Sequence, residues 1–444
     1  MTRHAPMDWT RLLCTARYGS DRPEPEGDIR SPFQRDYDRI IFSSHFRRLG
    51  RKTQVHPLNE NDNIHTRLSH SIETASVGRS LGQYIGAFLA ESGELPPGVT
   101  LEHLGQIVQT ACLAHDIGNP PFGHSGEAAI KSWFGRNKAL FEGVDEAYLK
   151  DLTRFDGNAM ALRILVRTGF GEAASGMRPT LAVLGAIMKY PMTSGHATKD
   201  KFSCLQSEAA VLEDVAERLG LVGEAGNYAR HPLAYLTEAA DDICYRIIDL
   251  EDATEVGILS GGFILEQFKD ALDLTGDRLA AYAGRQVRPR NSSLRAAIMT
   301  RAVLASVAAF RDNYEAIMRG EFEGGLLDAS PDPVCQALMA VYRRASQDIF
   351  LSKRKVELEL GAQRSLAILL ETFMAPALAL CTGQDGGGQR AQIEAILGQD
   401  RLATLGNGDL PCPYHIAVLV LDYLTGMTDH YATQMCRKFI GIGG

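Results

Sequence analysis

The stretch CLAHDIGNPPFGH, residues 112–124, decides the fold and the chemistry expected of this chain. Its first residues are apolar and suit the end of a buried helix, and the glycine and proline residues that follow turn the chain sharply. His115 and Asp116 lie at that helix end, while His70 upstream and Asp241 downstream offer a second imidazole and a second carboxylate. Because divalent cations bind such ligand sets, the sequence predicts a metal site here.

Helical periodicity recurs along the whole chain, whereas strand patterns are scarce. A long amphipathic helix is expected over residues 66–93, with His70 in its first turns, and a nearly apolar, buried helix over residues 101–115. Helical spacing returns near the C-terminus, over residues 365–380 and 416–424. The sequence therefore predicts an all-α protein.

A further helix, over residues 232–252, carries a polar stripe. Pro232 suits its first position, and Asp241, Tyr245 and Asp249 follow at intervals of four, which stacks them on one face. A polar stripe on such a helix needs a partner. This face is expected to complete the metal site.

Three segments read as irregular connections. Residues 20–35, rich in proline and charge, suggest a surface arm. Residues 284–295 are predicted to be a short basic, proline-broken connector, and residues 383–388 a flexible glycine-rich one. They are candidate subdomain joints, but no shift in composition demonstrates two domains.

Composition excludes several classes of protein. The chain has 444 residues, is 45% hydrophobic and carries a formal net charge of -8. It can bury a large core, and its acidic balance argues against a generally basic nucleic-acid-binding surface. The start of the chain lacks a signal-like apolar region, and no stretch approaches the roughly 18 uninterrupted apolar residues of a membrane span. We expect a soluble, cytoplasmic protein.

The eight cysteines show no Cys-x-x-Cys pair and no regular spacing. In mostly apolar surroundings, this pattern predicts reduced, buried thiols.

Four protein ligands on an ion that prefers six leave positions for water and for a substrate oxygen. Hydrolysis of a phosphoester or phosphoanhydride follows from that chemistry. Downstream of the turn, His124 and Glu127 lie three residues apart at the start of a new helix. A carboxylate that orients an imidazole can support proton transfer, although Glu127 can also be read as a helix N-terminal carboxylate.

Several segments together resemble a known family, the HD-domain deoxynucleoside triphosphate triphosphohydrolases. They are residues 47–49 with 52–55, 66–73, 115–127, 238–245 and 423–429. The resemblance runs in order from about Asp36 to Tyr431 and is greatest to the deoxyguanosinetriphosphate triphosphohydrolase-like branch. We expect an N-terminal arm (1–35), an HD phosphohydrolase core (36–320) and a helical C-terminal region (321–444). The C-terminal region matches the family less closely and is expected to pack on the core and contribute subunit contacts.

The resemblance implies one divalent metal ion per active site, either Mn, Mg or another first-row transition metal. Its ligands would be His70, His115, Asp116 and Asp241. Asp241 is preferred to the adjacent Asp242 because the family's phosphate-contacting tyrosine lies four residues after its ligand, and Tyr245 occupies that position.

The same resemblance assigns substrate contacts. Asp249 corresponds to the family's carboxylate for the sugar 3'-hydroxyl, and Gln54 to a residue beside the sugar. The phosphates would contact three cationic side chains, those of Arg67, Lys189 and Lys201. Asn158 matches a further position in the family's substrate site. Outside their motifs, Lys189 and Lys201 would read as solvated surface side chains, and the surroundings of Lys201 depart from the family pattern.

The activity implied is metal-dependent hydrolysis of deoxynucleoside triphosphates (dNTPs), dGTP first, to deoxynucleoside and inorganic triphosphate, with His124 and Glu127 as catalytic residues. The resemblance also implies a homo-oligomer, for which a hexamer is the first expectation. In some members of the family it implies activation by a dNTP or by single-stranded DNA.

Two other readings stay open. One is a different HD phosphohydrolase, such as a 5'-deoxynucleotidase or a cyclic-nucleotide or alarmone hydrolase. The other is a nucleotide-regulated or single-stranded-DNA-regulated sensor, supported only by four arginines that also suit a solvated loop: Arg285, Arg288, Arg290 and Arg295.

Overall fold

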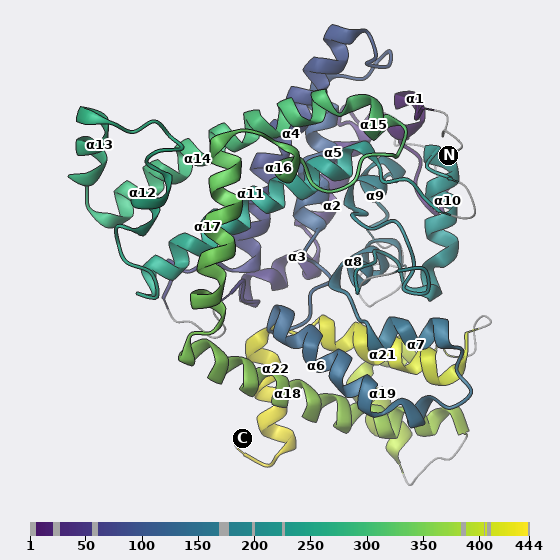
Figure 1. Ribbon diagram of the computed structural model, residues 1–444. Helices are drawn as coiled ribbons and strands as arrows, with labels where there is room; N and C mark the ends of the chain where they lie inside the picture. The colour runs from purple at the N-terminus through teal and green to yellow at the C-terminus, as the bar shows by residue number, and fades with distance from the viewer. Residues whose placement is uncertain are drawn as a thin grey trace.

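The computed structural model describes residues 6–20, 27–55, 61–167, 177–197, 200–223, 227–382, 388–403, 405 and 410–442. Over these ranges the regular structure is helical, and β-pairing is limited to isolated bridges (Figure 1). The predicted all-α fold class is confirmed.

The first half of the chain contains α1 (Trp9–Leu12), α2 (Pro32–Ile41), α3 (Ser44–Arg48), η1 (Leu49–Arg51), α4 (Arg67–Ser92), α5 (Leu101–Ala114), α6 (Gly123–Arg136), η2 (Lys138–Phe141), α7 (Glu146–Thr153), α8 (Gly157–Val166), α9 (Leu181–Ile187), η3 (Gln206–Glu208) and α10 (Ala209–Leu219), where η marks a 3₁₀ turn. The second half contains α11 (Pro232–Glu255), α12 (Phe263–Phe268), α13 (Gly276–Ala283), α14 (Val287–Asp312), α15 (Tyr314–Met318), α16 (Leu326–Ala329), α17 (Pro333–Phe350), α18 (Lys353–Leu378), η5 (Ala379–Thr382), α19 (Gln389–Leu397), α20 (Gln399–Leu402), α21 (Cys412–Thr425) and α22 (Asp429–Phe439).

Helices α4 and α5 form the close-packed pair that positions the metal site. A capping box between Thr66 and Ser69 starts α4, and Gly93 ends it in a left-handed conformation. The two helices approach so closely that a Cβ on Gly82 would lie 2.6 Å from the carbonyl oxygen of Leu104. His70 in the second turn of α4 thus lies beside His115 at the end of α5.

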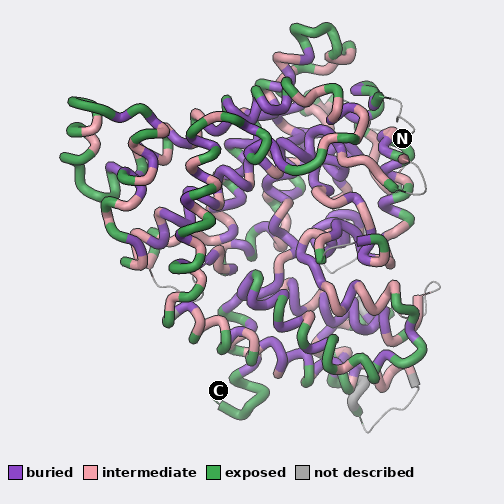
Figure 2. The backbone as a smooth tube through the Cα atoms, in the orientation of Figure 1, coloured by how far each residue is buried: buried purple, intermediate pink, exposed green. Residues whose placement is uncertain are grey.

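The buried apolar residues form two clusters. Figure 2 marks the buried stretches of the backbone. The first cluster contains α4, α5, α9, α11, α14 and α17. The second combines α6 and α8 with α18, α21 and α22, which lie in the lower part of Figure 1. Ile117 belongs to the first cluster and Phe122 to the second, so the loop after Asp116 crosses from one to the other. The predicted domain boundaries stay a prediction.

The connector predicted at residues 284–295 is wrong for most of its length, because α14 begins at Val287. Pro289 lies in the first turn of that helix, where a backbone N–H has no intrahelical partner to lose. The glycine-rich connector at 383–388 lies outside the described residues except for Gly388.

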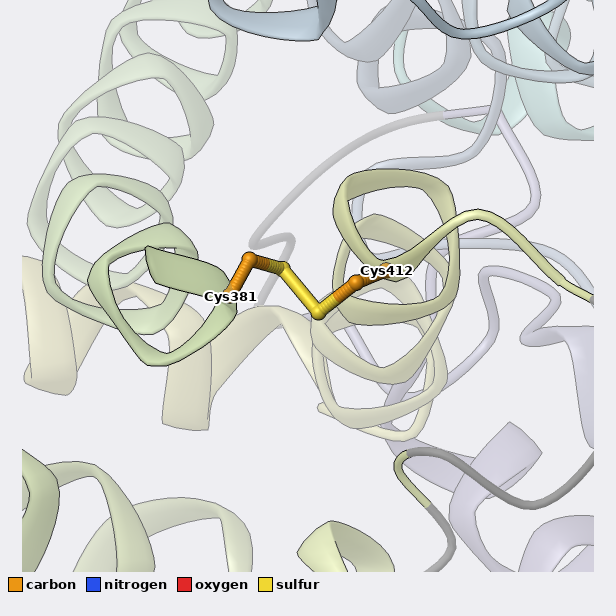
Figure 3. The surroundings of a disulfide bond; sticks show 2 residues. All are labelled: Cys381 and Cys412. Carbon is orange, nitrogen blue, oxygen red and sulfur yellow. A yellow bond between two sulfur atoms is a disulfide. The ribbon is translucent and has the colours of Figure 1, made fainter. Parts of the chain in front are cut away.

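The prediction of reduced thiols is wrong for two cysteines. A disulfide joins Cys381, at the end of η5, to Cys412, the first residue of α21 (Figure 3). The two are 31 residues apart in sequence, and only the return of the chain brings them together. The other six cysteines are free: Cys14, Cys112, Cys204, Cys244, Cys335 and Cys436.

Two helices, residues Val287–Asp312 and Lys355–Cys381, are long and apolar enough to cross a membrane by length and composition alone. Both contribute buried residues to the apolar clusters. Since core helices of soluble proteins meet the same criterion, this is weak support for a membrane span.

Candidate active site

A cavity of about 490 Å³ brings together all thirteen site residues predicted from the sequence. Its wall includes Gln54, Arg67, His70, His115, Asp116, His124, Glu127, Asn158, Lys189, Lys201, Asp241, Tyr245 and Asp249. They come from four helices (α4, α6, α8 and α11) and from the segments between helices, across most of the first 250 residues.

The metal end of the cavity consists of His70, His115, Asp116 and Asp241. One ligand atom each from His70, His115 and Asp116 lies within 4.8 Å of the other two. Oδ1 of Asp241 lies 3.0 Å from Nε2 of His70 and 3.5 Å from Nε2 of His115. All four side chains therefore point ligand atoms at one small volume.

A backbone carbonyl fixes the orientation of the His115 ring. Its Nδ1 lies 2.6 Å from the carbonyl oxygen of Cys112, which accepts a hydrogen bond from Nδ1–H. That tautomer leaves the Nε2 lone pair free to bind a cation. Asp116 is also held in place, as an acceptor. Arg67 donates a hydrogen bond to its Oδ2 at 2.7 Å, and the side-chain amide of Asn119 donates to its Oδ1.

The charge state of the metal end fits a divalent cation. Burial opposes ionisation of Asp241, but the imidazoles of His115 and His70 outweigh it and lower its pKa. Burial also opposes ionisation of Asp116, and here Arg67 is the leading influence that lowers the pKa. Two ionised carboxylates beside two imidazoles are a donor set that Mn, Fe, Co, Zn or Mg accepts.

Asp242 differs from its neighbour in partner and charge. It forms an ion pair with Arg246 at 2.9 Å, one turn further along α11. Burial raises the pKa of Asp242 to about 6. The geometry therefore places Asp241, rather than Asp242, beside both imidazoles.

His124 and Glu127 form a pair at the rim of the cavity. Nδ1 of His124 lies 3.1 Å from Oε2 of Glu127, and the other carboxylate oxygen accepts a hydrogen bond from the backbone N–H of Gly157 at 3.0 Å. Burial opposes ionisation of Glu127, yet His124 outweighs it and holds the pKa at about 2. The imidazole is 81% exposed, and its Nε2 remains available for proton exchange.

Each predicted phosphate-binding cation is held by one carboxylate. Arg67 pairs with Asp116, as described above. Lys189 lies 3.0 Å from Glu238, and Lys201 lies 3.6 Å from Asp156. Both lysines line the cavity; the Lys189 side chain is 27% exposed and the Lys201 side chain 41%. Asn158 donates to the same Asp156 at 2.8 Å.

The distal end of the cavity is formed by Gln54, Tyr245, Asp249 and Tyr342. Asp249 lies two helical turns beyond Asp241, about 12 Å along α11. The Tyr342 hydroxyl donates to Oδ2 of Asp249 at 2.7 Å. Oδ1 of Asp249 and Oε1 of Gln54 are buried and have no hydrogen-bond partner among the described residues. Burial raises the pKa of Asp249 to about 7.

Sequence reasoning missed the residues that the C-terminal half contributes to this end. They are Tyr342 and Phe350 on α17, with Lys355 and Glu359 on α18. Only helical periodicity marks this part of the sequence, and nothing in it indicated a place at the cavity.

The basic residues behind the sensor reading are engaged elsewhere. Arg288 pairs with Glu255, Arg295 donates to Glu251 at 2.7 Å, and Arg290 donates to the carbonyl of Gly261. None of them lines the cavity.

Comparison with known proteins decides the family. Residues 67–162 match the HD domain family. A deoxyguanosinetriphosphate triphosphohydrolase-like protein of Pseudomonas aeruginosa is 42% identical over 98% of this chain and 99% of its own length. The chain belongs to the deoxyguanosinetriphosphate triphosphohydrolase family. Similar full-length matches are the like-named protein of Synechocystis, at 33% identity, and the deoxyguanosinetriphosphate triphosphohydrolase of Serratia proteamaculans, at 32% over 94% of the chain and 95% of its own length.

This membership confirms the resemblance inferred from the motifs and makes the protein an enzyme, a hydrolase with the all-α HD fold of metal-dependent phosphohydrolases. The matched HD segment contains three of the four residues at the metal end, and Asp241 joins them from α11.

Proposed function

We propose that this member of the family hydrolyses dNTPs, dGTP first, to a deoxynucleoside and inorganic triphosphate, using one divalent metal ion per active site. The observation that carries the proposal is one cavity with three features. It contains the metal end, three cationic side chains that are each paired with a carboxylate, and, at the distal end, two carboxylate or amide oxygens without a hydrogen-bond partner among the described residues. The printed names of the relatives support the substrate class.

The cations suit a triphosphate. A triphosphate carries about four negative charges, and charge-assisted hydrogen bonds from Arg67, Lys189 and Lys201 would oppose them. Burial lowers the pKa of Lys189, but Glu238 outweighs it and keeps the ammonium charged. Tyr245, one turn after Asp241, would donate to a phosphate oxygen between the two ends of the cavity.

In this proposal, water attacks the α-phosphorus. A bound Mn or Mg ion would lower the pKa of a water molecule and offset negative charge on the phosphoryl oxygens. Glu127 holds the imidazole of His124, whose Nε2 would take a proton from the attacking water or pass one to the leaving sugar oxygen.

The distal end suits a sugar hydroxyl. Oδ1 of Asp249 and Oε1 of Gln54, which have no hydrogen-bond partner in the described part of the chain, would accept hydrogen bonds from the sugar. Crowding by Gln54 and its neighbours at C2' would favour deoxyribose over ribose.

A product assay tests the proposal. Purified protein with Mn or Mg is given each of the four dNTPs and GTP, and triphosphate, pyrophosphate and phosphate are resolved chromatographically. Triphosphate with deoxynucleoside is the expected product, fastest from dGTP. Equal rates with dGTP and GTP would refute the sugar selectivity. Phosphate from a deoxynucleoside monophosphate would indicate a 5'-deoxynucleotidase, and no product even with other dNTPs or single-stranded DNA added would indicate a sensor.

The wider properties of the enzyme belong to the same proposal. We expect a cytoplasmic homo-oligomer, a hexamer first, with a dNTP or single-stranded DNA as an activating effector. Light scattering of the purified protein with and without dNTP measures the assembly.

A further inference from the structure

Two buried ionisable residues far apart in sequence, Lys52 and Asp429, hold backbone segments next to the cavity wall. Lys52 follows η1, and Asp429 is the first residue of α22; each side chain is only 3% exposed. Burial lowers the pKa of Lys52 to about 7, and the carboxylate of Asp429 is the leading influence that favours its charged form. Such groups are costly to bury, so their hydrogen bonds indicate what they hold in place.

Asp429 connects two separate parts of the wall. Its Oδ1 accepts from the backbone N–H of Phe122 at 2.8 Å, and its Oδ2 accepts from the backbone N–H of Thr53 at 2.9 Å. Phe122 precedes Gly123, the first residue of α6, and the rim residue His124, whereas Thr53 precedes Gln54 at the distal end. Phe122 has a φ of +62°, a conformation that a phenylalanine rarely adopts without support.

Lys52 makes the complementary connection. Its Nζ donates to the carbonyl oxygen of Asn119 at 2.6 Å and to that of Thr425 at 2.5 Å, the last residue of α21. The Lys52 carbonyl in turn accepts from the backbone N–H of Arg67 at 3.0 Å. One buried pair thus contacts the loop after Asp116, the backbone of a phosphate-binding arginine and the C-terminal helices.

We propose that Lys52 and Asp429 act as positioning residues, through which α21 and α22 set the geometry of His124, Arg67 and Gln54 around the substrate. The inference rests on the proposed dNTP hydrolysis. Neither residue is a metal ligand, and Lys52 does not line the cavity. Their loss should therefore reduce turnover without removing the metal.

The test compares Asp429→Asn and Lys52→Met with wild type in the dGTP assay, with Mn affinity measured by calorimetry. Asn keeps the shape but only one acceptor oxygen, so Phe122 or Thr53 loses its partner. We expect kcat to fall about 10- to 100-fold, as for misplacement of catalytic groups by about 1 Å, with Mn affinity unchanged. The double variant should lose little more than either single variant, because the two act as a unit.

Thr428→Ala is the matched control. Thr428 caps α22 by accepting from the backbone N–H of Tyr431 at 3.2 Å, and its loss weakens that helix without touching the Asp429 hydrogen bonds. We expect Thr428→Ala to lower the melting temperature and leave kcat within about twofold of wild type, because surface-cap losses act on stability.

Three outcomes separate the ideas. If wild type is active and a folded Asp429→Asn variant has the same kcat, the positioning role is overturned. It is also overturned if Thr428→Ala lowers kcat as much as Asp429→Asn does. If Asp429→Asn does not fold, Lys52→Met decides alone, and its full kcat overturns the role. A wild type that hydrolyses no dNTP removes the proposed function itself.

Discussion

At the metal end of the cavity Asp116 and Asp241 have pKa values below the usual range, whereas at the distal end burial raises the pKa of Asp249 to about 7. Asp116 and Asp249 are both buried, so desolvation alone does not separate them, and the Asp241 side chain is 27% exposed. The metal-end pair has imidazoles and a guanidinium within contact distance, while Asp249 has the neutral Tyr342 hydroxyl as its hydrogen-bond donor. One cavity thus offers fixed negative charge for a cation and a near-neutral acceptor for a hydroxyl.

The largest expected effect comes from removal of a ligand at the metal end. Alanine at His115 or Asp116 should remove Mn binding and lower kcat/KM by more than about 100-fold, since even outer residues of metal sites cost 10- to 100-fold. Calorimetric titration with Mn and the dGTP assay measure both effects. Excess chelator on wild type should reproduce the loss, and readdition of Mn should reverse it. Retained metal and full activity in either variant would contradict the assignment.

Replacement of Asp249 by Asn sharpens the contrast at the distal end. Below pH about 7 a protonated Asp249 and an Asn are similar groups, so kcat/KM for dGTP should differ by only about twofold at pH about 6. Above that pH Asp249 ionises and accepts more strongly, and the difference should grow to about tenfold at pH about 8.5. The measurement is a pH profile of both proteins. Mn affinity serves as the control and should be unchanged. A ratio that does not vary with pH would show that Asp249 does not titrate in this range.

Tyr342→Phe tests why Asp249 is not shifted further. The hydroxyl hydrogen bond lowers the pKa of Asp249 against the effect of burial, so its removal should move the midpoint of the pH profile upward. The plateau rates should change less than the midpoint. An unchanged midpoint would mean that Tyr342 does not tune this carboxylate.

The smallest effect concerns an ion pair outside the cavity that joins the start of α4 to α11. His65, just before α4, lies 2.7 Å from Asp252 on α11. Burial opposes the charged imidazole, but hydrogen bonds to Asp252 and Glu73 outweigh it and raise the pKa of His65 to about 10. A raised pKa contributes stability that is complete below the unfolded value of about 6.5 and disappears as pH rises toward 10.

His65→Gln should therefore lower the melting temperature by about 1–3 °C at pH about 6.5 and by much less near pH about 10. Calorimetric scans across that range measure the difference. Glutamine keeps a hydrogen-bonding side chain, so a deficit that persists at high pH would reflect packing and not charge.

Much of the helical fold could be predicted from the sequence, because the local helix signals agree with the final packing. The capping residues of α4 and α11 and their apolar periodicity mark these helices almost to the residue. Residues 284–295 misled because a proline in the first turn of a helix has the same sequence appearance as one in a loop. The Cys381–Cys412 disulfide had no local sign, since cysteine spacing does not specify which thiols meet.

The sequence by itself determined the adjacent His115 and Asp116 and the polar face of α11, because short-range helix geometry fixes both. The packing of α4, α5 and α11 brings His70 and Asp241 to them. Only the tertiary structure decided that Tyr342 would reach Asp249 and that Asp429 would hold Phe122 and Thr53. Those contacts join segments separated by about a hundred residues or more, and periodicity says which face of a helix is buried but not which distant segment covers it.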